Sequence, residues 1–189
     1  MASFDSAIKI ILKHEGGYVN NPNDPGGATN YGISLRFIKD YPNYGDFDQD
    51  GDVDVNDIRK MTINQASMIY KIFWWDKFKY GQIADQTIAT KIFDFSVNMG
   101  ATRAHILLQE ALNNAFDLRL ECDGKLGPKT FHVLNAVLDG DEEQQLITAY
   151  CEAAWGFYQR LIAKNPKLKV FTKGWRNRAF DIDTANEFK

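Results

Sequence analysis

Apolar residues recur along most of this chain at the three- and four-residue spacing of an amphipathic helix. The first such stretch covers residues 4–14, where Ser3 is suited to cap the helix and Gly16-Gly17 to end it. Its apolar face consists of Phe4, Ala7, Ile8, Ile11 and Leu12. Further helices are predicted over residues 33–40, 62–75, 86–99, 102–116, 128–138 and 142–163, with a short last helix in 170–178.

Local signals for helix ends support several of these bounds. Thr62-Ile63-Asn64-Gln65 has the form of a capping box, Gly100 closes the apolar stretch 86–99, and Pro128 suits the first position of a helix. Residues 17–32 differ, because they contain two Pro and four Gly and predict a loop or a short hairpin. The sequence therefore predicts a mainly α fold with a small β-hairpin or loop region after the first helix.

Composition narrows the classes of function. The 189 residues carry a net charge of −3, which argues against a general nucleic-acid-binding protein. No apolar run reaches the roughly 18 residues needed to span a membrane, so membrane insertion is not expected. Two cysteines, Cys122 and Cys151, are too few for a disulfide scaffold, and the sequence leaves open whether they pair.

The chemistry of the chain centres on Glu15, the only glutamate before Glu110. It follows the first predicted helix, where the partial negative charge of a helix C-terminus favours a protonated carboxyl group. A protonated carboxyl group beside a turn-rich loop is what a general acid requires. A surface glutamate at a helix end is the alternative.

Asp24 and Thr29 are candidate partners of Glu15. A turn through Gly16-Gly17 would bring both opposite the glutamate, where an aspartate and a hydroxyl group can hold and deprotonate a water molecule. Attack by that water on the far face of a sugar would invert its configuration. Asp24 also lies in Asn23-Asp24-Pro25-Gly26, which is good turn chemistry, so a purely structural role is equally open.

Residues 14–34, HEGGYVNNPNDPGGATNYGIS, resemble the signature segment of glycoside hydrolase family 108, a family of bacterial and phage muramidases. The order of Glu15, Asp24 and Thr29 also resembles the Glu/Asp/Thr set of phage-type lysozymes, with the threonine one place nearer its aspartate. The resemblance implies a lysozyme-like fold in which Glu15 is the catalytic acid. The implied reaction is hydrolysis of the β-1,4 bond between N-acetylmuramic acid and N-acetylglucosamine.

The second half is similar to the peptidoglycan-binding region that follows such catalytic segments. The matching motifs are residues 95–100, Leu108-Gln109, residues 123–130 and residues 171–178. The resemblance implies a catalytic region over residues 1–92, a helical peptidoglycan-binding region over residues 93–189 packed against it, and bacterial peptidoglycan as the partner. Tyr31, Asn98 and Trp175 are candidate sugar contacts, and a structural role is the alternative for each.

Residues 46–57 fit the twelve-residue calcium loop. Gly51 stands at position 6, where the sharp turn needs it, while position 12 holds an aspartate instead of the usual glutamate, as in dockerin-like loops. Many carboxylates in so short a segment repel each other without a cation. A structural Ca²⁺ is therefore expected, although a solvated acidic loop is the alternative. The expected ligands are Asp46, Asp48, Asp50, Asp52 and Asp57.

The sequence is compatible with three functions. The first is a muramidase, expected to be a monomeric endolysin of phage or prophage origin. It would be made in the host cytoplasm without a signal peptide and act on the cell wall after release. The second is a lytic transglycosylase, which needs no water-holding aspartate and leaves a 1,6-anhydro product. The third is a non-catalytic, calcium-dependent wall-binding module.

Overall fold

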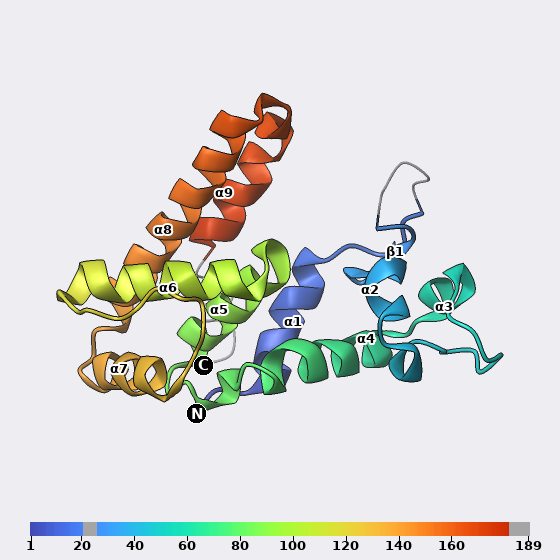
Figure 1. Ribbon diagram of the computed structural model, residues 1–189, viewed down its shortest axis with the longest axis horizontal. Helices are drawn as coiled ribbons and strands as arrows, with labels where there is room; N and C mark the ends of the chain where they lie inside the picture. Colours follow the sequence, from blue (N-terminus) through green and yellow to red (C-terminus); the bar gives the residue numbers. More distant parts are fainter. Residues whose placement is uncertain (21–25, 182–189) are drawn as a thin grey trace. The chain divides into compact units, whose positions relative to one another are not determined.

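The computed structural model describes residues 1–20 and 26–181. Within them the chain is mainly α-helical, with a two-stranded antiparallel hairpin after the first helix, which confirms the predicted fold class (Figure 1). The described residues form two compact units, one within residues 8–73 and one of residues 1–7 together with 74–181. These units divide the chain elsewhere than the expected boundary between 92 and 93, which falls inside helix α5 (Gln86–Met99).

Helix α1 starts where the sequence predicts. The Ser3 side chain accepts a hydrogen bond from the backbone N–H of Ser6 at 3.4 Å, as an N-cap does. The elements of the 8–73 unit follow in this order: the end of α1 (Phe4–His14), β1 (Thr29–Asn30), β2 (Ile33–Ser34), α2 (Leu35–Lys39), a 3₁₀ turn (Pro42–Tyr44), α3 (Val55–Lys60) and α4 (Ile63–Tyr70).

Buried isoleucines form much of the interior of the 8–73 unit, and a cluster of partly exposed rings packs beside α2. Isoleucines from α1, β2, α2, α3 and α4 are almost fully buried, namely Ile11, Ile33, Ile38, Ile58 and Ile69. Beside α2, four rings pack with centroids 4.2–5.4 Å apart, namely Phe37, Tyr41, Tyr44 and Phe73. Burial of these apolar groups is the main force that holds the short elements together.

Polar contacts then define where the hairpin and α4 lie. Asn30 is buried in β1, and its Nδ2 donates to the carbonyl oxygens of Ile58 at 2.9 Å and Met61 at 3.4 Å, which ties the hairpin to the end of α3. The predicted capping box at α4 is confirmed, since Thr62 and Gln65 exchange side-chain and backbone hydrogen bonds. A π-helical turn, Lys71–Asp76, continues α4.

The second unit contains the longer helices. Their bounds agree with the predictions to within about two residues at most ends, because the caps are encoded locally: the Asp85 side chain accepts from the Ile88 N–H at 2.8 Å, and Gly100 ends α5 at a φ of 87°. The elements are a 3₁₀ turn (Tyr80–Gln82), α5, α6 (Ala101–Phe116), α7 (Pro128–Asp139), α8 (Glu143–Lys164), a second 3₁₀ turn (Pro166–Phe171) and α9 (Thr172–Phe180).

A buried polar network joins several of these elements. His105 of α6 is within 3.0 Å of the Gly124 carbonyl through Nδ1 and within 2.8 Å of the Tyr80 hydroxyl through Nε2. Because a carbonyl group can only accept, Nδ1 carries the proton of the neutral ring and Nε2 accepts from Tyr80. The Tyr80 hydroxyl also lies 2.6 Å from Ser96 Oγ. Burial lowers the pKa of His105 and raises the pKa of Tyr80.

Two further expectations can be compared with the fold. Cys151 is buried in α8 and Cys122 is half-buried in the segment before α7, and both are free thiols. No helix in the described part of the chain combines the length and the apolar character of a membrane span.

Candidate active site

Glu15 lies immediately after the last residue of α1. Its backbone N–H donates to the Ile11 carbonyl at 2.9 Å, so the helical hydrogen-bond pattern extends through the residue. Its side chain is half-buried. The carboxyl group is thus positioned by α1, which is itself anchored in the core by Ile11 and its apolar neighbours.

The hairpin turn packs against this carboxyl group. The turn consists of Tyr31 and Gly32, which both have positive φ (48° and 78°), the sign pattern of a type I′ turn. A Cβ atom at Gly32 would lie only 2.7 Å from Glu15 Oε2 and 2.9 Å from Glu15 Cγ. Because Gly32 has no side chain, it leaves room for the side chain of Glu15.

Tyr70, the last residue of α4, reaches the same point. Its side chain is fully buried, and its hydroxyl group donates to the Tyr31 carbonyl at 2.9 Å. A Cβ at Gly32 would be closer to the Tyr70 hydroxyl oxygen than to any atom of Glu15. The end of α1, the hairpin turn and the end of α4 thus meet at the carboxyl group. The sequence did not point to Tyr70, which lies inside the helix predicted over residues 62–75.

Of the other two predicted catalytic residues, the structure describes Thr29 but not Asp24. Thr29 begins β1, and its backbone exchanges two hydrogen bonds of 2.8 Å with Val19, so the chain returns beside the segment that follows Glu15. Tyr31 contributes its carbonyl group to the contact with Tyr70. Asp24 lies outside the described residues. The catalytic roles of Asp24 and Thr29 stay predictions.

Asn98 and Trp175, the remaining predicted sugar contacts, are connected through one buried residue of α8. The Tyr158 hydroxyl donates to Asn98 Oδ1 at 2.7 Å, and the Tyr158 ring stacks on Trp175 with centroids 4.9 Å apart. Phe171 also stacks on Trp175, at 5.5 Å. These contacts hold α5, α8 and α9 together, so both residues have a structural role, and their contact with sugar stays a prediction.

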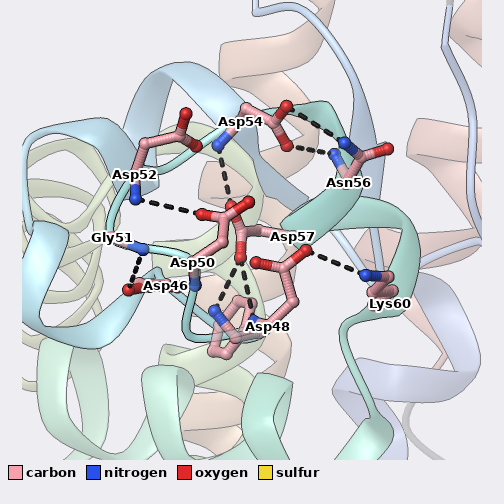
Figure 2. A network of polar contacts seen from close by, with 10 residues as sticks. Asp46, Asp48, Asp50, Gly51, Asp52, Asp54, Asn56, Asp57 and Lys60 are labelled. Atoms are coloured by element: carbon pink, nitrogen blue, oxygen red, sulfur yellow. Dashed lines mark hydrogen bonds and ion pairs between the residues drawn. The ribbon is translucent and has the colours of Figure 1, made fainter.

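The acidic loop brings its carboxylates together in two groups (Figure 2). One carboxylate oxygen from each of Asp46, Asp48 and Asp50 lies within 4.8 Å of the other two, and the same holds for Asp52, Asp54 and Asp57. Asp46 accepts hydrogen bonds from the backbone N–H groups of Asp50 and Gly51 at 3.2 and 3.1 Å, which closes the turn around Gly51. The first group matches the predicted ligands at positions 1, 3 and 5.

Asp57 serves a second purpose that the sequence pattern did not reveal. It is fully buried and accepts backbone hydrogen bonds from Phe47 at 2.7 Å, Asp48 at 3.2 Å and Asp54 at 2.8 Å. With Asp54 it forms the capping box of α3, a helix that begins inside the predicted calcium loop. In this structure its carboxylate oxygens are directed at backbone N–H groups.

Asp48 carries a buried carboxylate oxygen that could bind a cation. Its Oδ1 is buried and has no hydrogen-bond partner among the described residues, whereas its Oδ2 accepts from Lys60 at 2.9 Å. That hydrogen bond lowers the pKa of Asp48. Repulsion from Asp50 raises the pKa of Asp52. Oxygen ligands, mutual repulsion and a buried acceptor fit a hard divalent cation.

Comparison with known proteins agrees with this arrangement. Residues 8–100 match the family model described as glycosyl hydrolase 108, and residues 103–180 match the model described as a predicted peptidoglycan domain. The structure of Brucella abortus SagA superimposes with a TM-score of 0.74 and 25% sequence identity, covering 98% of this chain and 94% of that one. No curated protein shows significant similarity to the sequence.

Proposed function

We propose that Glu15 is the catalytic acid of this chain, a peptidoglycan hydrolase whose residues 8–100 match glycosyl hydrolase family 108 and whose residues 103–180 match a predicted peptidoglycan domain. The observation that carries the assignment is the packing of the Glu15 carboxyl group against Gly32. A general acid must be held in one orientation toward the leaving oxygen, and this contact restricts the side chain.

The bond that we propose is the β-1,4 linkage between N-acetylmuramic acid and N-acetylglucosamine. Glu15 would protonate the glycosidic oxygen, while Asp24 and Thr29 would hold the water that attacks the opposite face of the sugar, with inversion. The Glu/Asp/Thr order along the chain supports this division of roles. A lytic transglycosylase would use the same acid without a water-holding aspartate.

Digestion of purified peptidoglycan tests the assignment. The Glu15→Gln variant keeps the side-chain volume and loses the proton, so it should lower turnover by a factor of about 10² to 10⁴ while its melting temperature stays near that of the wild type. Mass analysis of the fragments should show reducing ends, and 1,6-anhydro ends would indicate a transglycosylase instead. Wild-type activity of Glu15→Gln would reject Glu15 as the acid.

The water-holding role of Asp24 is tested by comparing two aspartate variants. Asp24→Asn should lose most of the activity, whereas Asp40→Asn, at the exposed end of α2, should retain it. Near-normal turnover of Asp24→Asn would remove Asp24 from the mechanism and leave the role of Glu15 intact.

We also propose that residues 46–57 bind a structural Ca²⁺. The convergence of Asp46, Asp48 and Asp50 and the buried acceptor Asp48 Oδ1 support this site. Asp57 would act on the loop by holding its backbone N–H groups. The ion would stabilise the connection between α2 and α3 and take no part in the chemistry.

Thermal unfolding with and without a chelator tests the calcium site. At a free Ca²⁺ concentration of about 100 Kd, binding adds about 2.7 kcal/mol to the free energy of unfolding, or roughly 5–10 °C in melting temperature. Asp46→Asn/Asp50→Asn should abolish that difference, and the matched pair Asp139→Asn/Asp141→Asn should preserve it. A melting curve of the wild type that a chelator leaves unchanged would argue against the ion.

A further inference from the structure

The charge of this chain is unevenly distributed. Between Glu152 and Asp181 there are seven lysines and arginines and no acidic residue, although the chain as a whole has a net charge of −3. Four of the seven lie within ten residues, namely Lys164, Lys167, Lys169 and Lys173. A strongly basic segment in an acidic protein indicates a surface that meets an anionic partner.

The structure places these four lysines at the turn that joins α8 to α9, here called the cationic tip (residues 164–173). Figure 1 shows α8 and α9 side by side, with this turn at the end of the pair farthest from α6. All four lysines are exposed, and no acidic side chain of the described residues lies within ion-pair distance of them. By contrast, Arg178, farther along α9, lies 3.5 Å from Asp94 and is half-buried.

The cationic tip also exposes apolar side chains. Val170 is 79% exposed and Phe171 is 51% exposed, which makes Val170 the most exposed large apolar residue after Met1 among residues 1–20 and 26–181. Both lie in the 3₁₀ turn between α8 and α9. Phe171 is held in place by its stacking on Trp175, so the apolar pair is presented from an ordered surface.

We propose that the cationic tip binds the surface of an anionic phospholipid bilayer. Lysines attract the headgroups, and adjacent exposed apolar side chains enter the boundary between headgroups and acyl chains, which is the combination that interfacial binding requires. A glycan or a nucleic acid would use the lysines but offers nothing that would bury Val170. The ring best suited to stack on a sugar, Trp175, is half-buried and already stacked on Tyr158 and Phe171.

Co-sedimentation with vesicles tests the proposal on the full chain. The wild type should bind vesicles of mixed phosphatidylglycerol and phosphatidylcholine and should bind pure phosphatidylcholine much more weakly. Each basic residue near the membrane surface is worth about fivefold in the partition coefficient, so Lys167→Gln/Lys169→Gln should lower that coefficient about 25-fold. Val170→Asn should lower it about tenfold, because one buried valine is lost. The matched pair Lys77→Gln/Arg119→Gln, exposed residues outside the tip, should stay within about twofold of the wild type.

The same variants separate lipid binding from hydrolysis. Digestion of lipid-free peptidoglycan by the same variants is a separate readout, so failure of the vesicle experiment leaves the assignment of Glu15 untouched. Equal binding of the wild type to neutral and anionic vesicles would overturn the proposal. The proposal would also be overturned if the tip variants bound anionic vesicles like the wild type. Loss of binding to purified peptidoglycan or RNA with unchanged vesicle binding would overturn it as well.

Discussion

Gly32 offers the sharpest test of the site, because its substitution acts on Glu15 without changing any titratable group. In Gly32→Ala, the new methyl group would approach Glu15 Oε2 to 2.7 Å and would also overlap the Tyr70 hydroxyl. Tyr70 is buried and hydrogen-bonded, so it has little room to move, whereas the Glu15 side chain has flexible torsions. We therefore expect the glutamate carboxyl group to be the part that shifts.

Two effects contribute to the expected loss of stability in Gly32→Ala. A non-glycine residue at a φ of 78° costs about 1–2 kcal/mol, and overpacking of a close contact adds about 1–3 kcal/mol. At about 2–4 °C per kcal/mol, the melting temperature should fall by roughly 4–20 °C. Displacing the acid by about 1 Å costs on the order of 10²-fold in turnover, so activity at a temperature where the variant is folded should drop about 100-fold.

Gly27 provides the matched control. Its φ is 73°, close to that of Gly32, but among the described residues a Cβ there would meet only Leu35, at an ordinary 3.7 Å. Gly27→Ala should therefore show the backbone cost alone, with turnover near that of the wild type. Melting curves and peptidoglycan digestion of the two variants, measured side by side, separate the two parts. Equal melting temperatures and equal turnover for both variants would refute the packing of Glu15 on Gly32.

Two other predictions follow from the buried contacts. Tyr70→Phe removes the hydrogen bond to the Tyr31 carbonyl and should cost about 1 kcal/mol in unfolding free energy and roughly tenfold in turnover; an unchanged rate of peptidoglycan digestion would show that Tyr70 does not position the site. Because burial lowers the pKa of His105 in the folded chain, the unfolded chain takes up a proton first as the pH falls. The contribution of His105 to the free energy of unfolding should thus be complete above about pH 6.5 and decline below it. Between about pH 8 and about pH 5, the melting temperature should therefore fall further for the wild type than for His105→Gln.

Most helices of this protein are predictable from sequence because their signals are local. The apolar spacing within residues 4–14 and 86–99, the capping box at Thr62 and the proline at position 128 each act within one or two turns of the chain. Helix α3 is not predicted, because a different local signal covers its first residues. Its residues follow a run of aspartates whose pattern predicts a metal loop, and the capping role of Asp57 competes with that pattern over the same few positions.

The helical elements, the candidate acid Glu15, the acidic loop and the basic segment near the C-terminus can all be read from the sequence, since each depends on residues that are neighbours along the chain. Three features become visible only in the folded chain: Gly32 and Tyr70 pack beside Glu15, Trp175 is already stacked, and four lysines share an exposed turn with Val170. These contacts join segments that are distant in sequence, and their positions depend on how apolar faces pack when water is excluded.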